Sequence, residues 1–179
     1  KLQAKEIGKK LSSKKYNIKL IYISPLSRSK QTADIIGNGL KLEPISDDSF
    51  KPAYAGKAIG LLPQEINKRF GSGTVEKWRN EDEIFDSFSY PDGESKIQVR
   101  DRAINKIRNI LNDTRESDNI LIITHGFTLK QIIIGFGFRE QKYNKGIRNG
   151  EIVKLFYDKK NNIVHFVGRY SIINSLELK

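Results

Sequence analysis

The 179-residue sequence contains no cysteine, no methionine and only two histidines. Without cysteine, disulfide bridges, thiolate zinc sites and cysteine nucleophiles are excluded. Two histidines leave little for a histidine-rich metal site, and we expect no metal and no other cofactor. Because methionine is absent, we also expect that Lys1 is not the translated start. Any catalysis must therefore use His, Arg, Lys, Ser, Asp or Glu side chains.

Long apolar runs are also lacking. The longest run of apolar residues and glycine, from Ile132 to Phe138, is far shorter than the roughly 20 residues of a transmembrane helix. Hydrophobic residues make up 37% of the chain and charged residues 30%, which is typical of a globular protein. We therefore expect residues 1–179 to form a single soluble, cytoplasmic domain with no membrane partner.

The formal net charge is +11, and most of the excess lies in residues 1–30, which carry nine Lys or Arg residues and only one acid. Residues 1–13 show the apolar spacing of a helix, which places Lys5, Lys9 and Lys10 on its outer face. A solvated helix face explains these lysines, and contact with a phosphate backbone is the alternative. The basic residues do not form a stripe interleaved with aromatic residues, so nucleic-acid binding is the least favoured function.

Strand-like and helix-like segments alternate along the chain, which predicts an α/β domain. Residues 120–124 (ILIIT) are almost uniformly apolar, as in a strand of a parallel sheet that is buried on both faces. The last two strands are joined by a turn and predict an antiparallel hairpin. The expected strands are 18–24, 40–45, 120–124, 151–157 and 163–167, and the expected helices are 1–13, 26–36 (ended by Gly37 and Gly39), 63–70, 96–112 and 128–136, with irregular structure at 46–62 and 71–95.

Two segments carry residues suited to chemistry. In SPLSRSKQTA (24–33), Arg28 lies in the first turn of a predicted helix, and in THG (124–126), His125 lies between a strand and a helix. The carboxyl ends of parallel strands meet at one sheet edge, so we expect Arg28 and His125 to converge there. Neither helix has an acid in its first turn, although acids are favoured there. Backbone donors, helix dipoles and side-chain charge together predict an anion pocket, with phosphate as the natural guest.

Each of these residues also has a structural explanation. His125 alone could be a core histidine, and Arg28 alone could pair with a surface carboxylate. Their joint placement at two helix starts favours the pocket. His165, by contrast, alternates with apolar neighbours on a late strand, and we interpret it as structural.

Several strings of the sequence are similar to motifs of the histidine phosphatase, or phosphoglycerate mutase-like, superfamily. They are KLQAKEIGKKL, IYISPLSRSKQTADII, YPDGESKIQVRDR, LIITHGFTLKQII and RNGEIVKLFYD. Their order and spacing match over nearly the whole chain. The resemblance implies a three-layer α/β/α sandwich with a mostly parallel central sheet.

The resemblance also implies a mechanism. In that family, the histidine of an RHG motif attacks phosphorus and forms a phosphohistidine. Two arginines and a second histidine stabilise the transferring phosphoryl group. Arg28 corresponds to the second arginine and His125 to the second histidine, and Gly126 adds a backbone donor. The substrate would be a small phosphorylated molecule, and no metal is implied.

Two departures from the family pattern matter. No RHG occurs in residues 1–179, so the nucleophile and first arginine would lie upstream of Lys1, on a strand without which the Ile18 and Ile120 strands would be poorly paired. The second departure is Pro52, which aligns with the glutamate that often serves as the family's acid. Proline cannot transfer a proton, and the sequence does not select among the substitutes Asp48, Glu65 and Glu94.

Three functions remain open, namely a phosphatase of this family, a non-catalytic phosphate-binding relative and, least favoured, a nucleic-acid-binding module. A phosphatase is preferred to a mutase, because the stretch between Pro52 and the PDGES turn is short for an extended cap. A non-catalytic phosphate-binding relative would explain Pro52 and the lack of RHG.

Within residues 54–90, Trp78, Phe85 and Phe88 either line a cap or close a core, and the core interpretation is favoured.

Overall fold

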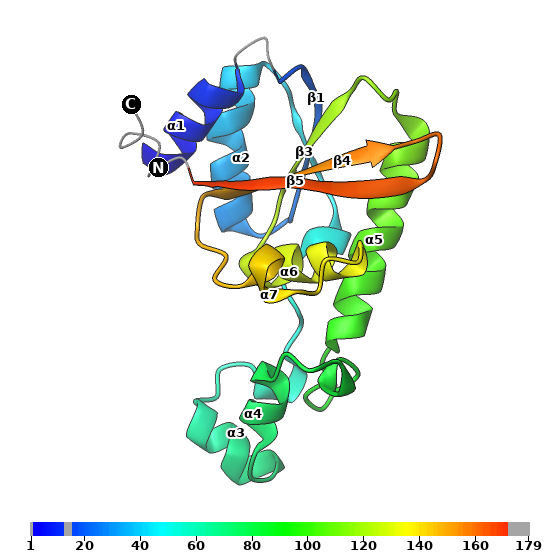
Figure 1. The fold of residues 1–179 in the computed structure, drawn as a ribbon. Coiled ribbons are helices and arrows are strands. Elements are labelled where there is room, and N and C mark those ends of the chain that lie inside the picture. The colour runs from blue at the N-terminus through cyan, green and yellow to red at the C-terminus, as the bar shows by residue number, and fades with distance from the viewer. Residues whose placement is uncertain (1, 13–15, 172–179) are drawn as a thin grey trace.

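The structure is a computed structural model that describes residues 2–12 and 16–171 (Figure 1). Its centre is a parallel sheet of three strands in the order β2-β1-β3. The middle strand pairs on both sides: Ile21 lies opposite Pro44 on one side and Leu121 on the other. The strands are β1 (Ile18–Ile23), β2 (Pro44–Ser46) and β3 (Asn119–Ile123).

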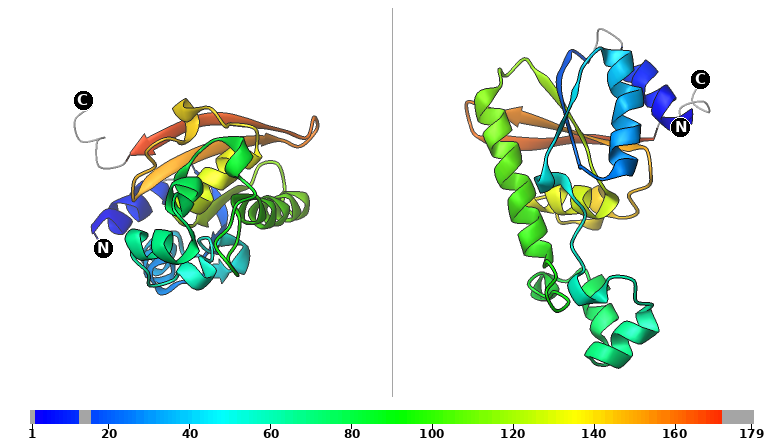
Figure 2. Two further views of the ribbon diagram at one scale, coloured as in Figure 1. Left: turned by 90° about the horizontal axis from the view of Figure 1, so that it is seen from below. Right: turned by 180° about the vertical axis from the view of Figure 1, so that it is seen from behind.

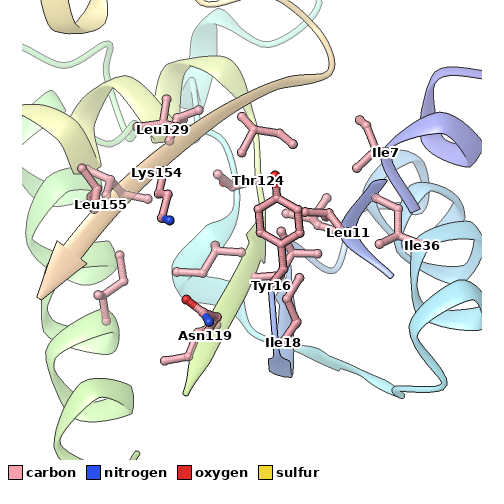
Figure 3. A pocket seen from close by; sticks show the side chains of 18 of the residues that line it. Ile7, Leu11, Tyr16, Ile18, Ile36, Asn119, Thr124, Leu129, Lys154 and Leu155 are labelled. Atoms are coloured by element: carbon pink, nitrogen blue, oxygen red, sulfur yellow. The ribbon is translucent and has the colours of Figure 1, made fainter. Parts of the chain in front are cut away.

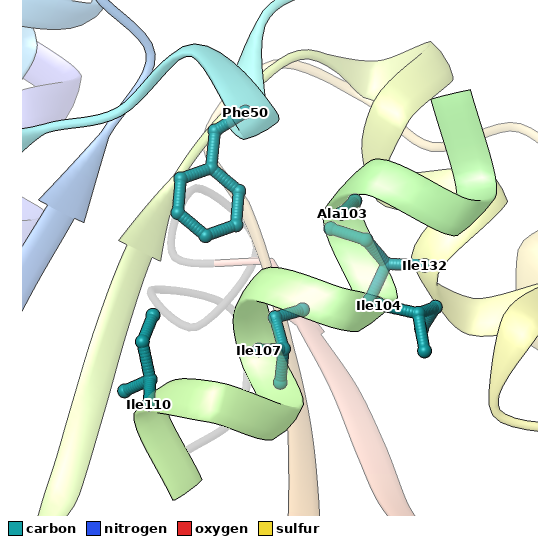
Figure 4. Close-up of a cluster of buried hydrophobic side chains, with 6 residues drawn as sticks. All are labelled: Phe50, Ala103, Ile104, Ile107, Ile110 and Ile132. Carbon is teal, nitrogen blue, oxygen red and sulfur yellow. The ribbon is translucent and has the colours of Figure 1, made fainter. Parts of the chain in front are cut away.

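Helices cover both faces of this sheet (Figure 2). On one face, Ile7 and Leu11 of the first helix pack with Ile36 of the second against alternate residues of β1 and β3. The other face is covered by a cluster around Phe50 to which the fifth helix contributes four side chains (Figure 4). This arrangement confirms the expected sandwich of helices, sheet and helices. The helices are α1 (Leu2–Leu11), α2 (Ser27–Leu40), α5 (Lys96–Asp113) and α6 (Gly126–Gly135).

The C-terminal part forms the expected antiparallel hairpin, β4 (Glu151–Asp158) and β5 (Ile163–Ser171), preceded by α7 (Gln141–Asn144). No ladder joins the hairpin to the three-stranded sheet within the described residues. Two side chains fasten its ends instead. Gln3 Nε2 donates to the carbonyl oxygen of Asn149, 2.6 Å away, and Lys159 Nζ donates to three carbonyl oxygens at the end of α5, those of Leu111, Asn112 and Thr114.

The Lys159 contact predicts a measurable contribution to stability. A lysine at a helix C-terminus satisfies free carbonyl groups and favours the helix dipole. We expect Lys159→Met to lower the free energy of unfolding by about 1 kcal/mol in urea titrations. Lys160→Met is the matched control, since Lys160 is exposed and its side chain has no hydrogen-bond or ion-pair partner among the described residues. Equal losses in both variants would show that the carbonyl contacts contribute nothing.

Residues 51–95 form a helical segment that projects away from the sheet (Figure 1). It contains α3 (Pro63–Phe70) and α4 (Thr74–Arg79), and three single-turn 3₁₀ helices flank or interrupt it: η1 (Asp48–Phe50), η2 (Gly56–Ala58) and η3 (Glu83–Phe85). The segment has its own small core, in which Trp78 and Phe88 pack around Tyr90. The aromatic residues Trp78 and Phe88 therefore close a core, as favoured from the sequence.

The helical segment joins the rest of the molecule through a neck where the chain passes twice. The Lys57 amide donates to the Pro91 carbonyl oxygen, and the Glu94 amide donates to that of Tyr54. Gly56 lies between these bonds with φ of +53°, and a Cβ atom there would lie 2.2 Å from the Pro91 carbonyl oxygen. Position 56 of the neck therefore accepts only glycine.

A buried ion cluster fastens the end of the helical segment to the helices behind the sheet. Asp86 is 2% exposed, and its Oδ2 accepts hydrogen bonds from Arg100 of α5 at 2.6 Å and from Arg139, just after α6, at 2.5 Å. Burial alone would raise the pKa of Asp86. The hydrogen bonds from Arg139 and Arg100 outweigh burial and hold that pKa below its usual value of 3.8.

Several local expectations are wrong. Gly37 and Gly39 do not end α2, which continues to Leu40 and stops at Lys41 in a left-handed conformation. Gly37 instead allows a close approach of residues 42–44, since a Cβ there would lie 2.6 Å from a carbonyl oxygen. The strand expected at 40–45 is consequently reduced to β2. The irregular stretch expected at 71–95 contains α4 and η3.

Two further expectations concern the first helix and the absence of a membrane-spanning helix. Lys5, Lys9 and Lys10 are exposed on α1, as expected, whereas Lys1 and Ser13, the ends of the predicted first helix, lie outside the described residues. In the described part of the chain, no helix combines the length and apolar character required to cross a membrane.

Candidate active site

Arg28 and His125 meet at the carboxyl edge of the sheet. Arg28 is the second residue of α2, which follows β1, and His125 is the residue that caps the start of α6, directly after β3. Since β1 and β3 are paired in parallel, their carboxyl ends lie together. Arg28 Nε donates to His125 Nδ1 at 3.2 Å, so the two side chains are in direct contact.

These contacts determine which nitrogen of His125 carries the proton. Nδ1 accepts from Arg28, and therefore a neutral ring must carry its hydrogen on Nε2. Nε2 lies 2.8 Å from Ser24 Oγ, to which it can donate. Ser24 is fully buried at the end of β1. The ring is thus held at both nitrogens, with one tautomer favoured.

The environment opposes a positive charge on His125. Burial, followed by the positive charges of Arg28 and Arg102, lowers the pKa of His125 from 6.5 to about 4. The imidazole is therefore neutral at neutral pH. Its folded pKa lies below the unfolded value, so this histidine contributes stability above pH 6.5 that is lost as the pH falls toward 4.

A titration followed by NMR tests this assignment. We expect the His125 ring to titrate near pH 4, with the Nε2–H tautomer at neutral pH. Inorganic phosphate should raise that pKa, because an adjacent anion stabilises the imidazolium. His165 is an internal reference, since it lies on the exposed hairpin beside Phe156, and its resonances should not respond to phosphate. Titration of His125 near 6.5, with no response to phosphate, would contradict the proposed environment.

The helix starts at this edge favour an anion. Neither α2 nor α6 has an acid in its first turn, and neither has a side-chain cap that occupies its free amides. Gly126 is the first residue of α6 and follows His125 directly. Backbone N–H groups, helix dipoles and the Arg28 guanidinium therefore all point to a negatively charged guest. No cluster of three or more metal-binding side chains exists among the described residues.

The segment 48–52 forms one wall of the site, and it is held by Arg102, a residue that sequence reasoning missed. The Arg102 guanidinium donates to the Glu94 carboxylate and to the carbonyl oxygens of Ser49, Lys51 and Pro52 at 2.6 to 3.1 Å. Threonines on both sides of His125 complete the attachment: Thr124 Oγ1 donates to the Phe50 carbonyl oxygen, and Thr128 Oγ1 donates to that of Lys51. The segment 48–52 is therefore bonded to residues on both sides of His125, at the end of β3 and in α6.

The three candidate acids occupy different places. Asp48 is exposed at the edge of this wall and pairs with Lys51 at 2.7 Å. Glu65 lies on α3, where its carboxylate accepts from the Leu62 amide and caps the helix. Burial alone would raise the pKa of Glu94, but hydrogen bonds from Arg102 and the Tyr54 amide outweigh it and lower that pKa. The carboxylates of Glu65 and Glu94 are thus held by backbone amides, whereas the exposed Asp48 side chain pairs only with Lys51 among the described residues.

A cavity of about 1010 Å³, here called the slot, opens between β3 and β4 and reaches the site at Arg28, His125 and Gly126 (Figure 3). The slot changes two expectations. The Ile18 strand is paired on both edges, so it is not short of partners. The strand at 120–124, expected to be buried on both faces, is β3, whose residues 120–123 are only half-buried because its outer edge faces the slot.

Comparison with known proteins identifies the family of this chain. The family model described as histidine phosphatase superfamily (branch 1) matches residues 1–168. The chain belongs to this superfamily. It is 26% identical over 156 residues to a phosphoglycerate mutase of Schizosaccharomyces pombe, covering 85% of this chain and 68% of the relative. It is 29% identical over 131 residues to the uncharacterized phosphatase PhoE of Bacillus subtilis, covering 73% of this chain and 58% of that protein.

Solved structures of the superfamily share the fold. A mycobacterial glucosyl-3-phosphoglycerate phosphatase, solved in complex with inorganic phosphate, superposes with a TM-score of 0.79 at 20% identity, over 96% of this chain and 85% of that one. This chain therefore has the phosphoglycerate mutase-like architecture. It spans 58% of the length of PhoE.

Proposed function

We propose that this member of the histidine phosphatase superfamily hydrolyses a small phosphomonoester through a phosphohistidine intermediate, with the nucleophilic histidine supplied by an RHG segment that precedes Lys1. The observation that carries the proposal is the direct contact of Arg28 with a neutral His125 at two acid-free helix starts. A site with these features favours a tetrahedral dianion over a cation. The phosphate-bound mycobacterial relative supports the same ligand class.

Each residue has a role in this mechanism. The nucleophilic nitrogen forms a bond to phosphorus while the ester P–O bond breaks, and water later attacks phosphorus and breaks the P–N bond to release inorganic phosphate. Arg28 binds the non-bridging oxygens, since its planar fork offers several donors. The Gly126 amide donates to the charge that develops on those oxygens, and His125 donates from Nδ1 once the adjacent anion has raised its pKa and protonated the ring. The leaving oxygen takes a proton from an acid, for which we propose Asp48, because Arg102 and the Tyr54 amide hold the Glu94 carboxylate and the Leu62 amide holds that of Glu65.

A phosphate-binding role without catalysis is the second candidate. Pro52 favours it, because Arg102 holds the Pro52 carbonyl in the wall while the residue itself has no proton to transfer. A mutase is less favoured, since the segment 51–95 holds only two short helices beside its 3₁₀ turns.

Trapping the intermediate tests the proposal. A protein that carries an RHG segment ahead of Lys1 should form an acid-labile, base-stable phosphohistidine when quenched during turnover, because the P–N bond survives in base. The matched control carries RAG in place of RHG and should form none. Residues 1–179 alone should show negligible turnover. Turnover at typical enzyme rates by this chain would place the nucleophile within it and contradict the role given to His125.

A further inference from the structure

A second cavity, here called the lysine cavity, lies between the end of α4, the start of α5 and the middle of α6. Its volume is about 180 Å³, and none of the residues that line it also lines the slot. Leu129 and Ile132 of α6 line the slot, whereas Lys130 and Ile134 line the lysine cavity. At 3.6 residues per turn these two pairs lie on opposite faces of the helix. The lysine cavity is therefore separate from the phosphate pocket at Arg28.

A buried ammonium group lines this cavity. Lys96, the first residue of α5, is only 5% exposed. Its Nζ donates to the carbonyl oxygen of Asn80, and it forms no ion pair with any residue that the structure describes. An ammonium group has three hydrogens to donate, and a buried charge is costly unless it is paired. Lys96 therefore has both the free donors and the charge to bind an anion.

The acids nearest to Lys96 are already engaged with other cations. Asp86 accepts from Arg100 and Arg139, and Glu81 pairs with Lys130. Among the charged residues that line the cavity, together with their ion-pair partners, five cations face three acids. The cations are Arg79, Lys96, Arg100, Lys130 and Arg139, and the acids are Glu81, Glu83 and Asp86. The surroundings of Lys96 are thus short of negative charge.

The pKa of Lys96 reflects the same shortage. Burial lowers this pKa below its usual 10.5, and the charges of Lys130 and Arg139 lower it as well. The carboxylates of Asp86 and Glu81 act in the opposite direction but do not restore the usual value. An anion bound beside the ammonium would stabilise its charged form.

The remaining walls of the cavity determine what kind of anion fits. The Trp78 indole stacks on the Phe127 ring, with centroids 5.4 Å apart, and Ile134 adds an aliphatic surface. These walls suit an apolar body, and the cavity is well below the roughly 300–1,000 Å³ of pockets for drug-sized ligands. Asp86 and Glu81 also line it, and their charges disfavour a dianion such as phosphate. A small molecule with one negative charge and a short apolar body fits best.

We propose that the lysine cavity is a binding site for a small organic carboxylate. The carboxylate accepts from the Lys96 ammonium, and the aliphatic part of the ligand lies against Trp78 and Phe127. Such a ligand bridges the helical segment and the two helices behind it, because it contacts α4, α5 and α6 together. The proposal is independent of the proposed phosphatase activity, since no residue of the phosphate pocket takes part.

Tryptophan fluorescence tests this site directly, because Trp78 is the single tryptophan of the chain and lines the cavity. The chain is titrated with sodium butyrate at constant ionic strength. We expect a saturable change in Trp78 emission. Butyramide, which has the same aliphatic body but no charge, is the matched ligand control. It should bind at least about tenfold more weakly, because a hydrogen bond between two charged groups is lost.

Three variants sharpen the titration. Lys96→Met should weaken butyrate binding by at least about tenfold, since it removes the ammonium and keeps an apolar side chain. Glu81→Gln should strengthen binding, because it removes a negative charge from the cavity and releases the Lys130 ammonium. A general loss of folding cannot produce this opposite effect. Lys77→Met is the control: Lys77 is exposed beside Trp78, does not line the cavity, and should leave the affinity within about twofold.

Four outcomes would overturn the proposal. Emission that does not saturate with butyrate would show that no site exists. Equal binding of butyramide and butyrate, or unchanged affinity in Lys96→Met, would show that the ammonium does not hold the ligand. Displacement of butyrate by inorganic phosphate would assign the cavity to the phosphate site. Saturable butyrate binding that persists with phosphate present and is lost in Lys96→Met would support it, whatever the outcome of the phosphohistidine experiment.

Discussion

Replacing Arg28 by lysine should lower kcat/KM for a phosphomonoester by about 100-fold or more in a protein that carries the RHG segment, a loss of about 3 kcal/mol of transition-state stabilisation. Lysine keeps the positive charge but is a point charge, and it cannot reproduce bidentate contacts to phosphoryl oxygens. It also lacks the planar Nε–H that donates to His125 Nδ1. Vanadate binding by the chain 1–179 should weaken in the same variant, measured by calorimetry.

Lys30→Gln is the matched control for this substitution. Lys30 lies in the same turn of α2 and is also exposed, but it makes no contact with His125. This change should leave kcat/KM within about twofold and alter stability by under about 1 kcal/mol. If Arg28→Lys retains full activity, Arg28 is a surface residue and the pocket loses its principal anion-binding side chain.

Replacing Asp86 by asparagine should lower the free energy of unfolding by about 3 kcal/mol, the largest effect on stability that we expect from a single polar substitution. The neutral amide leaves Arg100 without its charged partner, and it leaves Arg139 only the exposed Glu83 carboxylate, 3.8 Å away. Both groups already have a buried nitrogen without a hydrogen-bond partner in the described part of the chain, namely Arg100 Nε and Arg139 Nη1.

The pH dependence gives this prediction an internal check. The pKa of Asp86 is lower in the folded than in the unfolded chain, so its contribution is present above pH 3.8 and is lost as the pH falls below that value. Urea titrations of wild type and Asp86→Asn should therefore converge in acid. Glu81→Gln, which breaks the exposed pair with Lys130, is the control and should cost less than about 1 kcal/mol. A similar loss in both variants would contradict the special position of Asp86.

The convergence of Arg28 and His125 was accessible from the sequence because it depends on order along the chain. Each residue follows an apolar run and precedes a helix, and parallel strands bring such positions to one edge. The contacts with Ser24 and the lowered pKa of His125 were not accessible, since they depend on distances of a few ångströms.

Arg102 illustrates what periodicity misses. It lies on α5, a helix that the apolar spacing predicted well, but its partners are carbonyl oxygens of the non-periodic wall at 49–52. The side chains of residues 49–52 do not predict an arginine partner, because Arg102 binds their backbone carbonyl oxygens. The same limit applies to α2, where two glycines resembled a helix end although they allow close packing.

The neck at Tyr54–Lys57 and Pro91–Glu94 has an evolutionary consequence. The two chain passes are bonded to each other through their backbones, and the core around Tyr90 is built from residues 55–90. Between the passes, Trp78 stacks on Phe127 and Asp86 binds Arg100, and these contacts tie the segment to α6 and α5. Insertions or deletions that spare both contacts therefore leave the register of the sheet and the position of Arg28 and His125 unchanged. Evolution can therefore change α3 and α4 without changing the sheet edge that carries Arg28 and His125. Relatives can then share the same phosphoryl-transfer site and differ in their substrates.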